Sequence, residues 1–353
     1  MPLAGLTRLR KHQAGRQTAF GTPVAAKRAY GVTGVPDVNL NWTDPEVDTG
    51  SIDVTATPHR EKGEYTEPWE FPSLEYNDLP IIISSFFGGD EDPTGSGDAL
   101  TWHHHPASVA PLDPEDFYTN EFGDDVLDDW FQLRDGIAES FAINGPDGPG
   151  VCTASIGWRY GSAASTGSTD SPVTGTVPTP GLSVDIAGTK VYRKDLSIFI
   201  ADDPDDLEYS QILHALHSFE LSGTKEIDEK SWADGTQSFD AQDMGVTSRA
   251  ITFRATFAKT DDIVGLGSEA DHWFSDQAVN RYVRLQFTSL VDAEYDVPYS
   301  FKIDMPFRYY TREDGESGGN SVVILEGHAF YDPELFDGIW DSVIVNTLPA
   351  AGL

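Results

Sequence analysis

The sequence predicts a mainly β protein with one short helix in each half of the chain. Runs of alternating, β-branched and aromatic residues recur along all 353 residues, turn dipeptides separate them, and only two segments have helical features. Eight Trp, thirteen Tyr and nineteen Phe supply core side chains, which an acidic disordered chain lacks. The chain is therefore expected to fold around real hydrophobic cores.

Strand patterns occur in both halves of the chain. In the first half they cover Val38–Thr43, Ser51–Thr57, Tyr65–Phe71, Ala99–His103, Phe117–Phe122, Ala138–Ile143 and Val151–Tyr160. In the second they cover Leu196–Ile200, Ser218–Ser222, Arg249–Ala258, Arg281–Thr288, Tyr299–Met305, Val322–Phe330 and Ile339–Leu348. Turns are predicted at Asn144-Gly145, Asp147-Gly148, Asp234-Gly235 and Asp314-Gly315.

Two segments are predicted to be helical. Leu79–Phe87 follows the possible caps Asn77 and Asp78, carries Pro80 in its first turn, and stops at Gly88-Gly89. The second helix is expected near Ser268–Ala278, with Trp273 and Phe274 on one face.

Charge is the unusual feature of the composition. There are 58 acidic residues against 23 basic ones, 9 Lys and 14 Arg, which gives a net charge of -35. Such a chain repels itself in dilute salt, because charges interact over about 10 Å at 0.1 M but only about 3 Å at 1 M. The composition indicates a protein that stays hydrated and soluble in molar salt.

The charge is unevenly distributed. Residues 1–36 contain six bases and no acid, and the first acid is Asp37. We interpret residues 1–36 as a basic N-terminal arm that contacts an acidic neighbouring subunit, with DNA binding as the less favoured alternative. Its expected contact residues are Arg8, Arg10, Lys11, Arg16, Phe20, Val24, Lys27 and Arg28.

The remaining chain divides at a segment rich in Gly, Ser, Thr and Pro. Residues 162–180 are expected to form a linker or long exposed loop between two β domains, 37–161 and 181–353. The two domains have a similar order of expected elements but negligible residue identity. A duplicated fold and a single domain both remain open.

No motif indicates catalysis or a cofactor. His103, His104 and His105 alternate sides of a strand, so they are expected to form a polar strand edge rather than one metal site. The acidic clusters at 124–129 and 202–206 lack the pattern of a calcium loop and are expected to be solvated, with nonspecific cations at most. Cys152 is expected in the core, and no apolar run is long enough for a transmembrane helix or a secretory signal.

The order of several short segments resembles the tail tube (major tail) proteins of long-tailed phages and haloarchaeal tailed viruses. The similar segments are Gln17–Ala26, Tyr65–Gly89, Glu139–Trp158, Phe219–Gly223, Arg249–Phe253, Gly327–Tyr331 and Val343–Leu348. The extreme acidity and the segment 162–180 depart from the family pattern.

The resemblance implies a structural virion protein and not an enzyme. It implies a tail-tube-type β-sandwich or barrel, made in the host cytoplasm and assembled in the virion tail as stacked rings. Its partners would be further copies, in trimeric pseudo-sixfold rings or alternatively hexameric ones, and other tail proteins at the tube ends. Genomic DNA would pass through without specific binding, and no membrane or cofactor would be involved.

Two rival functions remain open. One is a halophilic β-sandwich carbohydrate-active enzyme, which needs a cleft with convergent carboxylates. The other is a capsid or decoration protein of the same virus, which would share the composition and the β content.

Overall fold

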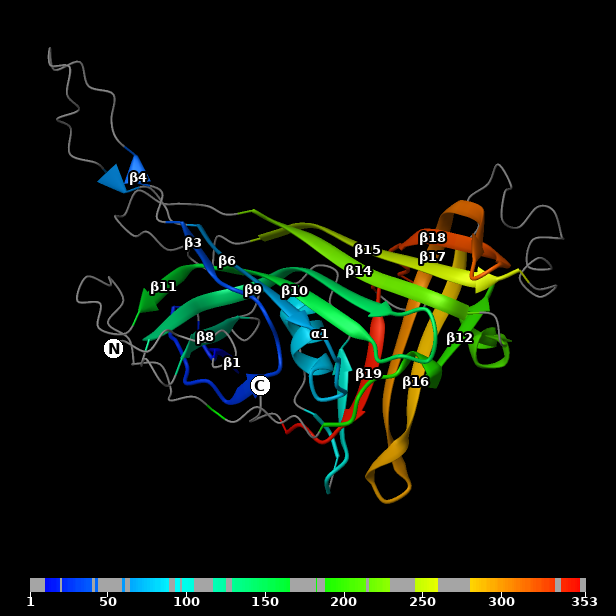
Figure 1. The fold of residues 1–353 in the computed structure, drawn as a ribbon, viewed down its shortest axis with the longest axis horizontal. Coiled ribbons are helices and arrows are strands. Elements are labelled where there is room, and N and C mark those ends of the chain that lie inside the picture. Colours follow the sequence, from blue (N-terminus) through cyan, green and yellow to red (C-terminus); the bar gives the residue numbers. More distant parts are fainter. Residues whose placement is uncertain are drawn as a thin grey trace, which may run out of the picture.

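The computed structural model describes residues 10–19, 21–39, 42–43, 59–60, 64–88, 93–95, 97–104, 117–124, 129–165, 182, 188–213, 216–228, 245–259, 280–333 and 338–349. Within these ranges the chain is mainly antiparallel β-structure, as the sequence predicts (Figure 1). The second expected helix, the strand 51–57 and the turn at Asp234-Gly235 lie outside the described residues.

Strands in the first half are β1 (Arg10–Arg16), β2 (Arg28–Tyr30), β3 (Asp37–Asn39), β4 (Trp42–Thr43), β5 (His59–Arg60), β6 (Glu64–Phe71), β7 (Leu100–His104), β8 (Tyr118–Asp124), β9 (Asp129–Gly145), β10 (Thr153–Tyr160) and β11 (Ser162–Ser165). Those in the second half are β12 (Leu196–Ala201), β13 (Gln211–Ile212), β14 (Leu216–Asp228), β15 (Gly245–Ala258), β16 (Asn280–Glu294), β17 (Val297–Ser317), β18 (Asn320–Ala329) and β19 (Asp341–Asn346). Short 3₁₀ turns cover Arg193–Asp195 and Pro204–Tyr209.

Of these strands, β4 and β5 form a separate two-stranded sheet, and the others form one extended, strongly curved sheet. Its main path runs β3-β6-β10-β9-β14-β15-β18-β17-β16-β12-β13, and β17 also pairs with β19, which pairs with β7. A branch runs β2-β1-β8-β9-β11. The two expected domains are therefore joined directly, because β9 pairs with β14 and β7 pairs with β19.

Helix α1 (Leu79–Phe87) occupies the predicted residues and is buried on every side. Its first turn accommodates Pro80, whose missing N–H is not needed there, and Gly88 ends it with a φ of 70°. Phe86 and Phe87 pack against Phe141 at ring distances of 4.8 and 6.1 Å. A helix without a polar face matches a position inside the molecule rather than on its surface.

The N-terminal segment differs from the expected arm. Residues 10–16 form strand β1, which lies between β2 and β8, and His12, Gln13 and Ala14 are buried. Polar residues tolerate this burial because they find partners across the sheet, with Gln13 Nε2 donating to Glu121 at 2.6 Å. The described part of residues 1–36 thus contributes strands to the sheet.

Three further local expectations need correction. Asn144-Gly145 is not a turn, because both residues belong to β9 and pair with β14. Residues 162–165 of the expected linker form β11, which pairs with β9. Asp314-Gly315 is not a turn, because both residues pair with β18 and the chain reverses at Gly318-Gly319, with φ values of 58° and 83°. Two consecutive residues of positive φ suit the tight turns of β-hairpins, and glycine reaches them without strain.

Candidate assembly surface

The hairpin β16–β17 projects from the body of the molecule (Figure 1). Val283, Leu285 and Phe287 of β16 are fully buried, yet three residues later Leu290 is 89% exposed. The ladder shifts register between Thr288 and Glu294, and the chain reverses with Asp296 at a φ of 61°. The strand pattern that fills the core therefore continues beyond it into solvent.

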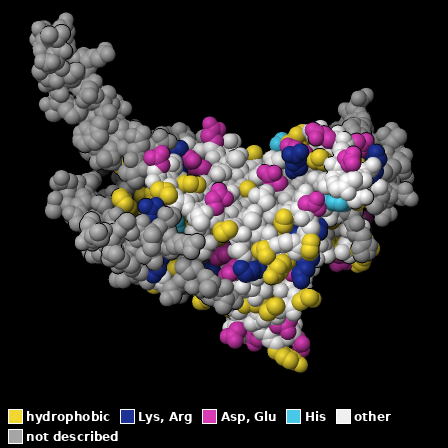
Figure 2. Space-filling view, in the orientation of Figure 1, with side chains coloured by type: hydrophobic (Ala, Val, Ile, Leu, Met, Phe, Trp, Pro, Cys, Tyr) yellow, Lys and Arg dark blue, Asp and Glu magenta, His cyan; other side chains and the backbone are white. Residues whose placement is uncertain are grey.

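The end of this hairpin exposes four apolar side chains, Leu290, Val291, Tyr295 and Val297. It also carries Asp292, Glu294 and Asp296, and no Lys or Arg lies between Arg284 and Lys302. Figure 2 shows apolar and acidic side chains gathered at the projecting end. We call residues 290–297 the hairpin tip. Clustered apolar exposure on a soluble protein is typical of a contact surface.

A neighbouring loop braces the hairpin tip. Glu294 Oε2 accepts a hydrogen bond from the backbone N–H of Ala99 at 3.4 Å. Gly97, with a φ of 110°, lies so close that a Cβ there would be 2.5 Å from Glu294 Oε1. The tip therefore has a support outside its own two strands.

A second distinctive surface lies toward the other end of β17. Tyr310 is 52% exposed and its ring lies 4.3 Å from that of His328, while its hydroxyl donates to Glu326 Oε1 at 2.6 Å. Arg308 donates to the Asn280 side chain at 2.7 Å and lies 5.1 Å from the Phe330 ring. Arg254 lies beside Glu326 at 3.7 Å. We call Arg254, Arg308, Tyr310, Glu326 and His328 the β17 patch.

The expected arm residues within the described chain mostly contact their own subunit. Arg10 lies 5.6 Å from the Phe122 ring, and Lys11 and Arg16 belong to β1. Val24 donates its N–H to Thr119 Oγ1 at 3.1 Å, and Lys27 has an exposed side chain. Arg8 and Phe20 lie outside the described residues, so an inter-ring role for the set stays a prediction.

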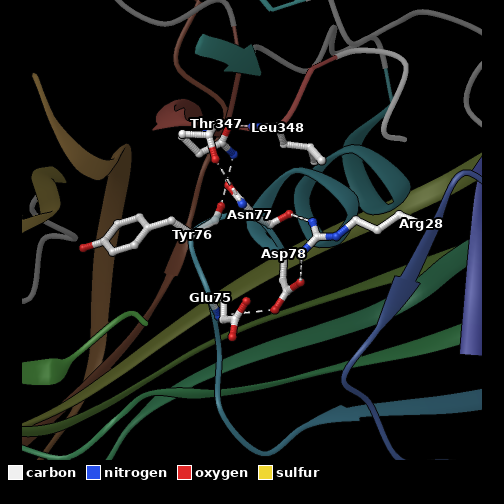
Figure 3. Close-up of polar contacts among 8 residues, drawn as sticks. Arg28, Glu75, Tyr76, Asn77, Asp78, Thr347 and Leu348 are labelled. Atoms are coloured by element: carbon white, nitrogen blue, oxygen red, sulfur yellow. Dashed lines mark hydrogen bonds and ion pairs between the residues drawn. The ribbon is translucent and has the colours of Figure 1, made fainter. Parts of the chain in front are cut away.

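Arg28 belongs to a hydrogen-bond network that joins three segments far apart in sequence (Figure 3). Its guanidinium donates to Asp78 Oδ1 at 2.9 Å and also to the Asn77 carbonyl, just before α1. From the other side, the Asn77 amide exchanges hydrogen bonds of 3.3 Å with Thr347. Asn346 donates to the Tyr76 carbonyl at 3.1 Å. The N-terminal strands and the residues after β19 are thus held at the start of α1.

A buried polar network lies between β1, β6, β8 and β10. His12 Nδ1 is 2.9 Å from Glu67 Oε1, and Tyr160 donates to Glu67 Oε2 at 2.8 Å. Asn120 donates to the Tyr160 hydroxyl at 2.6 Å. Burial, followed by the charge of Glu67, raises the pKa of Tyr160 well above its usual value. Periodicity could not reveal this network, because its members are far apart in sequence.

Asp135 is a second buried carboxylate in this region. It has a positive φ of 54° and accepts a hydrogen bond from the Gly21 N–H at 2.7 Å. Burial raises the pKa of Asp135 to about 6, and the hydrogen bond from Gly21 opposes this. The carboxylate holds the turn after β1 against β9.

The residues considered for metal binding do not converge. His103 is exposed and His104 is buried on opposite sides of β7, whereas His105 lies outside the described residues. Asp203 accepts a hydrogen bond from the Asp205 N–H at 3.0 Å, which starts a 3₁₀ turn. Across the described ranges, no group of three or more His, Cys, Asp or Glu side chains could hold a metal ion.

A polar cleft of about 460 Å³ lies over β9, β10, β14 and β15. Two carboxylates line it, Glu139 and Glu226, each with a side-chain partner. Arg159 donates to Glu139 at 2.7 Å, and Ser248 donates to Glu226 at 3.3 Å. Of the two carboxylates, Glu139 is held in an ion pair with Arg159.

No protein-family model matches the chain, and no curated protein has a matching sequence. Within the described residues, no helix has the length and apolar character needed to cross a bilayer.

Proposed function

We propose that the chain is the tail tube protein of a tailed virus from a saline habitat and assembles with copies of itself into stacked rings. The observation that carries the proposal is the projecting hairpin tip, where Leu290 and Tyr295 are 89% and 88% exposed. Exposing such side chains in a soluble monomer is unfavourable by about 25 cal/mol per Å². A partner that covers them removes this cost.

The charge of the chain fits a conduit for DNA. Each phosphate contact with a cationic protein releases counterions and strengthens binding, so a tube that lets DNA pass should carry few accessible cations. The 58 acidic residues outnumber the 23 basic ones, so the net charge of the chain repels phosphate. Like charges on neighbouring subunits repel, and molar salt screens this repulsion within about 3 Å. Assembly is therefore expected to require high salt.

Among the possible kinds of self-assembly, the resemblance in segment order to tail tube proteins favours a tail tube. Ring number remains part of the proposal, with three chains if each half acts as one tube-type unit and six if the chain acts as one. Direct pairing of β9 with β14 is compatible with both numbers, because it joins halves within one chain.

Electron microscopy of the purified protein in molar salt tests the proposal. Stacked annular rings or tubes with a DNA-wide channel are expected, and the end-on view gives the ring number. Closed shells would favour the capsid alternative instead. A protein that stays monomeric at every concentration and salt would refute the proposal and return attention to the cleft beside Glu139.

A further inference from the structure

We infer that the hairpin tip of one copy docks on the β17 patch of the next copy, so that strand β17 joins consecutive rings. This inference rests on the proposed self-assembly and assigns its axial contact. The two surfaces are parts of one continuous strand, β17, which runs from Val297 to Ser317.

The position of the two surfaces dictates a head-to-tail contact. Val297 is the first residue of β17 and Tyr310 lies thirteen positions further along it, and Figure 1 shows the hairpin loop far from the β15–β18 region. In such a stack each copy contacts its two neighbours through two different surfaces. A hairpin tip therefore stays free at one end of the stack and a β17 patch at the other end. Each added copy therefore presents the same pair of surfaces, and the stack grows without closing.

The hairpin tip and the β17 patch are also chemically complementary. The tip is apolar and acidic, with Asp292 and Asp296 exposed beside Leu290 and Tyr295. The patch offers the exposed ring of Tyr310 and the guanidinium of Arg308, whose contacts with Asn280 and Phe330 are uncharged. Tyr and Arg are the residues that most often dominate the binding energy of interfaces.

The β17 patch also contains acidic residues, and their positions determine on which side the acidic tip is expected to approach. Glu326 is held by Tyr310 at 2.6 Å and by Arg254 at 3.7 Å, and Glu220 faces Arg254 across the β14–β15 pair. An acidic tip is therefore expected to approach on the Arg308 side. Figure 2 shows Lys, Arg and His side chains with acids among them at this end of the molecule.

Strand geometry gives the spacing between rings. Eleven to thirteen positions separate Val297 from the Arg308–Tyr310 part of the patch, which at about 3.3 Å per residue spans about 36–43 Å. Docking of tip on patch therefore predicts an axial repeat of about 40 Å. A repeat above about 50 Å exceeds the reach of the strand and would overturn the inference.

Thiol cross-linking tests the contact directly. The double variant Ala293→Cys plus Thr311→Cys places one thiol at the tip and one at the patch, and leaves Leu290, Tyr295 and Arg308 in place. These positions are too far apart within one chain for a short bismaleimide, and the native Cys152 is fully buried. Tubes of the double variant should give a ladder of covalent oligomers, whereas each single variant should give no ladder beyond dimers.

A matched pair of variants provides a second, independent test of the contact. Leu290→Ser plus Tyr295→Ser removes the apolar tip, and Val35→Ser plus Tyr209→Ser removes side chains that are 55% and 79% exposed elsewhere. The tip variant should raise the protein concentration needed for tube growth about tenfold or more while leaving separate rings, and the control should not. Tubes of the double-cysteine variant that give no ladder, or tip-variant tubes that grow normally, would overturn the inference and leave the tail tube proposal standing. Wild-type protein that forms no rings would refute both.

Discussion

Lys225 provides a direct test of whether the two halves of the chain unfold together. It belongs to β14 in the second half, is 6% exposed, and donates to the carbonyls of Ser85 and Phe86 at 3.2 and 2.8 Å. These carbonyls are at the C-terminal end of α1 in the first half, where a cation also interacts favourably with the helix dipole. The side chain therefore bridges the halves.

Replacing Lys225 with Met keeps most of the side-chain volume and removes the charge. Two hydrogen bonds from a buried cation are lost, with an expected decrease in the free energy of unfolding of about 2–4 kcal/mol. If all 353 residues unfold as one unit, this lowers Tm by about 3–5 °C. If the half that contains α1 unfolds separately, two transitions are expected, and the Tm of one of them is lowered by about 6–11 °C.

Differential scanning calorimetry in molar salt measures both the shift and the number of transitions. Lys302→Met is the matched control, because its ammonium lies 3.2 Å from Asp304 but its side chain is 32% exposed. Asp304 is buried, but it keeps two hydrogen bonds from Arg284 when Lys302 is replaced, so the loss is expected to be less than about 1 kcal/mol. Equal effects of the two substitutions would refute the stabilising role of Lys225 at the end of α1.

Three further predictions concern the buried network and the charge. Tyr160→Phe should lower the free energy of unfolding by about 2–3 kcal/mol in urea titrations, because Glu67 and Asn120 each lose a buried partner, whereas Tyr209→Phe should change nothing measurable. Burial raises the pKa of Asp135 to about 6 from about 3.9 in the unfolded chain, so its stabilising contribution is complete below about pH 4 and is lost as pH rises through about 6. Wild type should therefore lose about 2–3 kcal/mol relative to Asp135→Asn between pH 4 and pH 7, and a pH-independent difference would contradict this. Dilution from molar salt to below about 0.1 M should lower Tm and disperse any rings, since 35 net charges then repel with little screening, and an unchanged melting curve would argue against a halophilic protein.

The sequence alone determined the class of fold and most of its elements. Alternation along Arg249–Ala258 and Arg281–Thr288 predicted strands that the structure confirms, because side chains of a strand alternate between core and solvent. The helix Leu79–Phe87 was predicted to the residue, since Pro80 and Gly88 limit where a helix can begin and end. These features depend only on neighbours along the chain.

The tertiary structure decided what the exposed and polar residues do. Leu290 and Val291 have the composition of a core strand, and only the length of β16 beyond the body places them in solvent. The basic start of the chain suggested a separate arm, whereas residues 10–16 pair with β8, over a hundred positions away in sequence. Local pattern fixes the conformation of a strand, but its partners come from long-range packing, which brings Gln13 to Glu121 and Lys225 to α1.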